Sequence, residues 1–125
     1  MKLFVIIIIN LLLISCSESN TNPDLADTKT ESIKMIELGA DDCIPCQKMQ
    51  PVLKSLDERY GDNLIVEFID VYKEYEKAAP YNIKAMPTQV FLNDAGQEIH
   101  RHIGFYPEDE IDEFLQGYNI YPLNN

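Results

Sequence analysis

Two cysteines three positions apart, Cys43 and Cys46, are the residues of this sequence best suited to chemistry. A pair with this spacing can be a redox dithiol, half of a zinc site, or a coincidence. The pair follows a short apolar run and a Gly-Ala-Asp-Asp loop, and it opens a segment with helical periodicity. The free N–H groups and the dipole at a helix N-terminus stabilise a thiolate. This position favours a redox dithiol, in which Cys43 attacks a partner's disulfide and Cys46 resolves the mixed disulfide.

A zinc site would need further thiol or imidazole ligands. The only histidines, His100 and His102, are two residues apart and would share one face of a strand, so a Cys₂His₂ site with Cys43 and Cys46 is arithmetically possible. Nothing in the sequence places the histidines beside the cysteines, and we interpret them as solvent-facing strand residues. We therefore expect no metal and no other cofactor, and we keep a metal-binding module as an alternative function.

Hydrophobic patterns predict the elements that position the dithiol. An apolar run over 33–38 predicts a buried strand, and apolar offsets of 3, 4, 7 and 11 predict a helix over 43–60 that Pro51 should kink. The same patterns and turn residues predict a strand at 64–70, a short helix at 74–81, strands at 88–92 and 98–103, and a last helix from Pro107 to Tyr118. The resulting order, β-α-β-α-β-β-α, indicates a four-stranded mixed sheet with flanking helices.

The N-terminal segment resembles a bacterial lipoprotein signal peptide. After Lys2, residues 3–14 are apolar except for Asn10. This run is too short for a transmembrane helix, which needs about 20 residues, but it has the length of a signal-peptide core. Ser15 then precedes Cys16, so cleavage between them would leave Cys16 as a lipidated N-terminus. An ordinary secretory signal is the alternative.

The composition of the remaining chain predicts a tether and one domain. Residues 1–15 would be removed, 16–32 carry the lipidated cysteine and a polar, flexible tether, 33–120 form the domain, and 121–125 form a tail. The 125 residues contain 10 Lys and Arg against 21 Asp and Glu, for a net charge of -11. Such an acidic chain is poorly suited to nucleic acid. We expect a monomer that contacts the membrane through its lipid.

From about Ile33 to Tyr118 the sequence resembles a thioredoxin-family domain. The resemblance implies a thioredoxin fold and thiol-disulfide exchange with protein substrates. With the membrane anchor, it points to the extracytoplasmic branch of the family, which includes proteins of cytochrome c maturation. The matching motifs, in chain order, are Ala40-x-x-Cys43-Ile44-Pro45-Cys46, Pro51 in the following helix, Ala85-Met86-Pro87-Thr88 before a strand, and Gly104 after the last strand.

The resemblance also implies roles for residues outside the two cysteines. Pro87 matches the family's cis-proline, which faces the dithiol, and the backbone of Met86 would pair with an extended substrate. Ile44 and Pro45, between the cysteines, are expected to contact the substrate as well. Glu37 matches the family's buried acid, usually Asp, which implies a proton relay to or from the second cysteine. The alternative for Glu37 is a solvent-facing strand residue.

The main departure from the family pattern is Asp42, because most members have Trp just before the first cysteine. Asp41 and Asp42 would both disfavour a Cys43 thiolate, which favours a reducing potential, and Pro45 also matches the reducing members. We predict a lipid-anchored reductant of protein disulfides in the bacterial cell envelope, facing the periplasm or exterior. A membrane thiol-transfer protein would supply its electrons. Disulfide oxidase or isomerase activity is one alternative, and a non-catalytic interaction domain is another.

Overall fold

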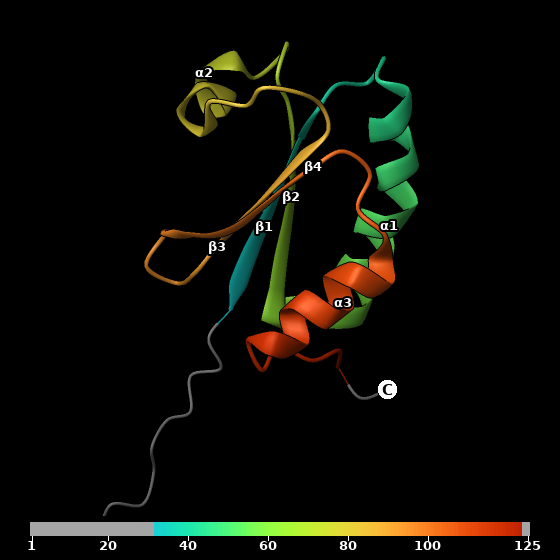
Figure 1. Cartoon of the computed structure of the whole chain (residues 1–125), viewed down its shortest axis with the longest axis vertical. Helices are drawn as coiled ribbons and strands as arrows, with labels where there is room; N and C mark the ends of the chain where they lie inside the picture. The colour runs from blue at the N-terminus through green and yellow to red at the C-terminus, as the bar shows by residue number, and fades with distance from the viewer. Residues whose placement is uncertain (1–31, 124–125) are drawn as a thin grey trace, which may run out of the picture.

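The computed structural model describes residues 32–123, which form a four-stranded mixed sheet with helices on its two faces (Figure 1). The predicted signal peptide, Cys16 and nearly all of the tether lie outside the described residues. The observed order is the predicted β-α-β-α-β-β-α. Its elements are β1 (Ile33–Gly39), α1 (Ile44–Tyr60), β2 (Leu64–Asp70), α2 (Tyr75–Ala78), β3 (Thr88–Leu92), β4 (Glu98–Ile103) and α3 (Glu108–Gly117).

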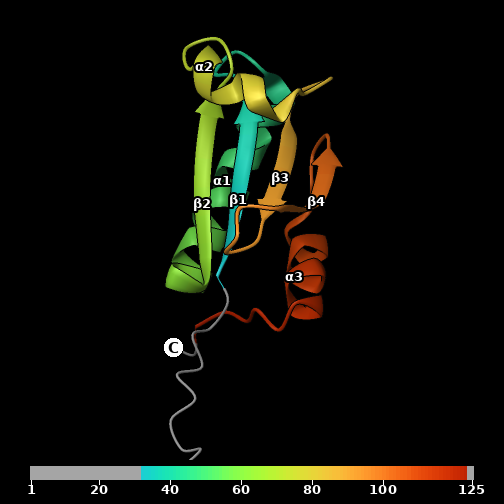
Figure 2. The same cartoon turned by 90° about the vertical axis from the view of Figure 1, so that its left-hand side faces the viewer.

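The strands lie in the order β2-β1-β3-β4, with β1 and β3 in the centre (Figure 2). β1 pairs in parallel with β2 and antiparallel with β3, and β3 and β4 form an antiparallel hairpin. Helix α1 is the crossover between the two parallel strands, as a βαβ unit requires. The carboxyl end of β1 therefore leads straight into the loop before α1, and the two cysteines lie at the N-terminus of that helix.

The two faces of the sheet are buried against different helices. On one face, Ile33 and Met35 of β1 pack with buried residues of α1 and α3. On the other face, Ile36 and Leu38 pack against Ala78 of α2 and its neighbours. Figure 1 shows the same division, with α1 and α3 on one side of the sheet and α2 on the other. By strand alternation, Glu37 belongs to the face that α1 covers.

Two helix boundaries differ from the prediction. The segment predicted as one helix over 74–81 is a single α-helical turn, α2, followed by the 3₁₀ turn Ala79–Tyr81. Pro80 explains the change, because it has no N–H to continue the α-helical hydrogen bonds. Pro107 is the N-cap of α3 and not its first helical residue. Pro51, in contrast, lies inside α1, which is one element from Ile44 to Tyr60.

Polar side chains hold α3 against the C-terminal end of α1. Nη2 of Arg59 donates to Glu108 and Asp112, with both nitrogen–oxygen distances 2.7 Å. The hydroxyl of Tyr60 donates to Asp112 over 2.8 Å. The loop between β4 and α3 also contacts α1. In this loop the Tyr106 N–H donates to the buried Met49 sulfur over 3.3 Å.

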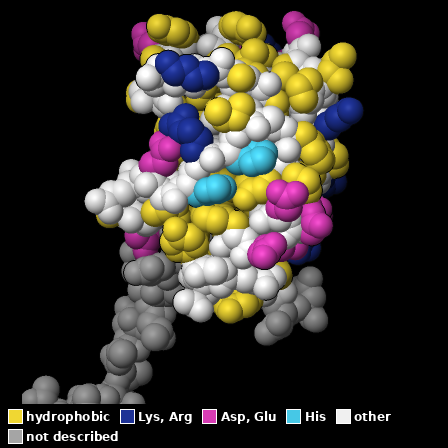
Figure 3. Space-filling view, viewed as in Figure 1, with side chains coloured by type: hydrophobic (Ala, Val, Ile, Leu, Met, Phe, Trp, Pro, Cys, Tyr) yellow, Lys and Arg dark blue, Asp and Glu magenta, His cyan; other side chains and the backbone are white. Residues whose placement is uncertain are grey.

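The two histidines are not the solvent-facing residues that we expected. Both are half-buried, and they pack among aromatic rings at the junction of β4, α3 and the intervening loop. The His100 ring stacks on Phe114 at a centroid distance of 4.5 Å, and His102 stacks on Tyr106 at 3.9 Å. Their exposed parts are visible in Figure 3. The alternation of β4 indicated one shared face, but only the packing of α3 decides that this face is covered.

No group of three or more His, Cys, Asp and Glu residues suited to a metal ion occurs between residues 32 and 123. Within the same range, no helix is both long and apolar enough to cross a membrane.

Candidate active site: a dithiol beside a cis-proline loop

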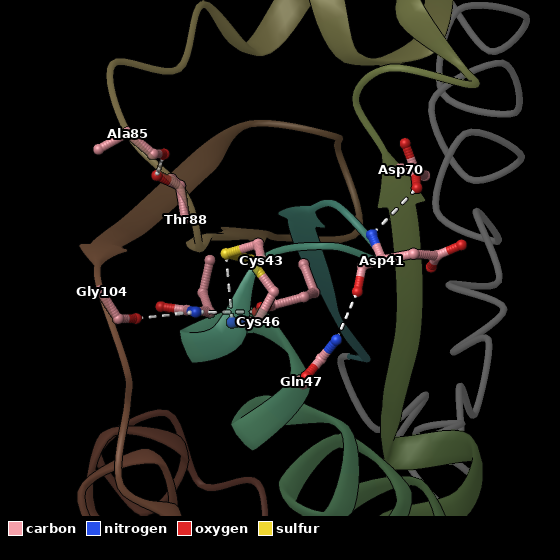
Figure 4. Close-up of a disulfide and its surroundings, with 10 residues drawn as sticks. Asp41, Cys43, Cys46, Gln47, Asp70, Ala85, Thr88 and Gly104 are labelled. Atoms are coloured by element: carbon pink, nitrogen blue, oxygen red, sulfur yellow. Dashed lines mark hydrogen bonds between the residues drawn. A yellow bond between two sulfur atoms is a disulfide. The ribbon is translucent and has the colours of Figure 1, made fainter.

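Cys43 and Cys46 form a disulfide at the N-terminus of α1, with their Cα atoms 5.2 Å apart (Figure 4). Cys43 is the N-cap residue, and its sulfur accepts a hydrogen bond from the Cys46 N–H over 3.4 Å. Cys43 is half-exposed, whereas Cys46 is 1% exposed. Only the first sulfur is therefore accessible to a macromolecular partner, which is the asymmetry that attack by one cysteine and resolution by the other requires.

The loop before the dithiol is held by hydrogen bonds on both sides. The Cys43 N–H donates to the Ala40 carbonyl over 3.2 Å. Figure 4 shows the other two bonds: the Gln47 side chain donates to the Asp41 carbonyl over 2.7 Å, and the Asp41 N–H donates to an Asp70 carboxylate oxygen over 3.3 Å. The position of Cys43 thus depends on the end of β2 as well as on α1.

Gly39 makes room for the buried cysteine. A Cβ atom at this position would lie 3.0 Å from the Cys46 sulfur and 3.2 Å from the Phe68 ring. In the sequence we interpreted Gly39 only as the first residue of the loop between the predicted strand and the dithiol, whereas it is the last residue of β1. A glycine at the end of a strand also marks places where another group approaches the backbone closely, and that signal identifies its role here.

A second loop carries the residues that the resemblance implied for substrate binding. The Met86–Pro87 peptide bond is cis. The Thr88 hydroxyl donates to the Ala85 carbonyl over 2.8 Å, and the Gly104 N–H donates to the Pro87 carbonyl over 2.8 Å. In the view of Figure 4, Ala85, Thr88 and Gly104 lie on the opposite side of the dithiol from Asp41 and Asp70.

The predicted substrate-contacting residues differ in their exposure. Ile44 is 68% exposed, and Pro45 is also exposed, so both are accessible beside Cys43. Met86 is half-buried, and Pro87 is buried. The exposed groups at the dithiol turn are therefore side chains, whereas at the second loop the Pro87 side chain is not accessible.

Glu37 is fully buried, so the solvent-facing alternative is wrong. Its side chain shares the face of β1 with Gly39, the residue against which Cys46 packs. Gln89 on β3 donates to its carboxylate over 2.8 Å. Burial raises the pKa of Glu37 from 4.5 to about 7, although the Gln89 hydrogen bond opposes part of the increase. A carboxyl group with this pKa can both accept and release a proton near neutral pH.

A family model described as thioredoxin matches residues 13–117 of the chain. The chain belongs to the thioredoxin family. It is 30% identical to a thioredoxin of Bacillus subtilis over 76% of this chain and 90% of that protein. It is 31% identical to a thioredoxin of Staphylococcus aureus over 71% of this chain and 86% of that protein. A solved mutant thioredoxin of Halobacterium salinarum superposes with a TM-score of 0.62 at 29% identity, covering 70% of this chain and 74% of that one.

Membership of the thioredoxin family identifies the chemistry of the dithiol. The chain is a thioredoxin-like thiol-disulfide oxidoreductase, and Cys43 and Cys46 are its disulfide-forming pair. The family acts on protein disulfides. Catalysis of this kind needs a nucleophilic thiolate at one cysteine and a proton acceptor for the other.

The charges beside Cys43 in this thioredoxin-like site differ from those expected from the sequence, because a lysine lies next to one of the two carboxylates. Lys73, which follows β2, forms ion pairs with Asp41 and with Asp70. Asp42 has no ion pair with any residue in the described part of the chain. Of the two carboxylates that we expected to disfavour the thiolate, one is therefore paired with a cation and the other is not.

Gln89 is a buried site residue that our sequence analysis missed, as it missed Gln47, Asp70 and Lys73 around the loop before the dithiol. It is a direct neighbour of Glu37 across the β1–β3 ladder, and it is fully buried. A polar residue inside the otherwise apolar end of a strand was a usable signal. Its partner could not be identified from the sequence, because the pairing register of β1 and β3 is a property of the folded sheet.

Proposed function

We propose that this thioredoxin-family protein is a lipid-anchored reductant of protein disulfides outside the cytoplasm. Asp42 is the observation that carries the reducing direction. Its exposed carboxylate comes immediately before Cys43, and no described cation forms an ion pair with it. A negative charge at this position disfavours the Cys43 thiolate. Since the thiolate belongs to the reduced form, its destabilisation makes the dithiol a better electron donor.

The reaction follows from the exposure of the two sulfurs. The Cys43 thiolate attacks a client disulfide, forms a mixed disulfide and releases one client thiolate. Glu37 then accepts the proton of the Cys46 thiol, and the Cys46 thiolate attacks the Cys43 sulfur. The second client thiolate leaves, and the Cys43–Cys46 disulfide is formed. Two electrons have passed to the client, so a membrane protein with its own dithiol must reduce the pair again.

Substituting Asp42 tests the proposed reducing direction. We expect Asp42→Asn to lower the pKa of Cys43 by about half a pH unit, the size of an exposed charge–charge interaction at high dielectric. The equilibrium potential should become less reducing. The pH dependence of Cys43 alkylation and a glutathione redox titration measure the two effects.

Two matched variants accompany this measurement. Asp41→Asn also removes a negative charge and releases Lys73 from that ion pair, so it should lower the pKa of Cys43 as well. Asp62→Asn, at the far end of α1, should leave that pKa unchanged. A wild-type potential close to that of the strong periplasmic oxidants, about -120 mV, would contradict the reductant and favour the oxidase.

A separate experiment tests the anchor, which depends on residues outside the described range. In a bacterial host that processes lipoproteins, we expect the wild-type chain to incorporate a labelled fatty acid and to fractionate with membranes. Cys16→Ala should lose the label and leave the membrane fraction, whereas Cys43→Ser should retain both. Release of unlabelled wild-type protein into the soluble extracytoplasmic fraction would instead indicate an ordinary secretory signal.

A further inference from the structure

Glu37 and Gln89 form a buried polar pair in the middle of the sheet. They are direct partners in the antiparallel ladder of β1 and β3, and both are fully buried. Nε2 of Gln89 donates to Oε2 of Glu37 over 2.8 Å. Among residues 32–123, Oε1 of Glu37 has no hydrogen-bond partner. The Gln89 amide is therefore the single described donor to this carboxyl group.

The same amide nitrogen is also hydrogen-bonded to the segment that follows β4. Nε2 of Gln89 also donates to the Gly104 carbonyl over 3.1 Å. The Gly104 N–H in turn donates to the Pro87 carbonyl over 2.8 Å. An amide nitrogen has two hydrogens, and both are used here. One side chain thus joins the buried acid to the two segments that carry Pro87 and Gly104.

We propose that Gln89 is a positioning residue for disulfide exchange, because its amide holds the Glu37 carboxyl and fixes it relative to the two segments that carry Pro87 and Gly104. The inference rests on the proposed function, in which Glu37 takes the proton of the Cys46 thiol before the thiolate attacks Cys43. A donor to a carboxylate favours its charged form. Gln89 therefore helps to set the pH at which Glu37 can accept that proton.

The other groups around Glu37 leave this control to Gln89. On β2 its partner is Phe68, which is apolar, and on β4 the next residue in the same row is His102. On the face covered by α1, the nearest part of the dithiol is Cys46, which packs against Gly39 two residues along β1. Burial raises the pKa of Glu37, and the Gln89 hydrogen bond lowers it. Without the amide donor, burial would act unopposed.

The test is to remove the donor while keeping the volume of the side chain. In oxidised Gln89→Met, we expect the carboxyl ¹³C titration of Glu37 to move upward by about one to two pH units, the range expected for a hydrogen bond to a charged group. The pH midpoint of insulin reduction should move in the same direction. In a Glu37→Gln background, Gln89→Met should no longer shift the pH profile.

Two further variants separate positioning from a loss of stability. Val90→Ala removes a buried side chain from the next position of β3, on the opposite face, and should lower stability without moving the Glu37 titration. Gln89→Asn keeps an amide, but its shorter side chain should not reach the Glu37 carboxylate. It replaces Gln89→Met if that variant does not fold, and it should also shift the Glu37 titration upward. An unchanged Glu37 titration in a folded Gln89 variant would overturn the positioning role and leave disulfide exchange intact. Wild-type protein that reduces no disulfide at any pH would instead overturn the proposed function.

Discussion

Replacing Cys43 with serine is expected to abolish disulfide reduction. The rate of insulin reduction should fall by at least about a thousand-fold, because a serine hydroxyl is not ionised near neutral pH and cannot replace the thiolate nucleophile. Cys43 is the accessible sulfur of the pair, and Cys46 is buried behind it. The buried thiol therefore cannot take over the first attack.

The complementary variant, Cys46→Ala, should stall the reaction after its first step. A mixed disulfide between Cys43 and the client would accumulate, and mass spectrometry of the trapped species would identify the client. Cys16→Ala, which leaves both site cysteines in place, should retain full activity in the soluble assay. Substantial turnover by Cys43→Ser, or failure of Cys46→Ala to trap any client, would contradict the assignment of the two roles.

Replacing Glu37 with glutamine is expected to stabilise the protein by an amount that grows as the pH rises from 4.5 to about 7 and is complete above that range. The pKa of Glu37 is raised in the folded protein from 4.5 to about 7. Folding therefore favours the neutral form of Glu37. In wild type, the stability that the neutral carboxyl permits is fully present below pH 4.5 and is lost as the pH rises to about 7. At pH 8, Glu37→Gln should have a free energy of unfolding higher than wild type by about 3 kcal/mol.

Urea unfolding of the oxidised proteins at about pH 4 and about pH 8 measures this difference. At the lower pH the two proteins should differ little, because wild-type Glu37 is then mostly neutral in both states. Glu113→Gln, an exposed change on α3, should alter the free energy of unfolding by less than about 0.5 kcal/mol at either pH. Equal stability of wild type and Glu37→Gln at the higher pH would show that the buried carboxyl carries no such cost. The same variant should slow disulfide reduction, since it cannot accept the Cys46 proton.

Local patterns determined the course of the chain and the chemistry of the dithiol. The strands at 33–38 and 64–70, the helix between them and the cysteines at its start were all predicted within one or two residues. These features depend on residues close in sequence: apolar periodicity selects helix or strand, and a helix N-terminus offers its free N–H groups to whatever side chain begins it. The nucleophile could be named for the same reason.

The tertiary structure decided what surrounds those residues. Alternation along β1 left Glu37 with two possible environments, and only the packing of α1 on that face buries it. Lys73 reaches Asp41 from the end of another strand, and Gln89 meets Glu37 through the register of β1 and β3. Burial, ion pairing and register join residues far apart in the chain. They set the charge beside Cys43 and the pKa of Glu37, because both quantities depend on distances that exist only after the sheet and helices have packed.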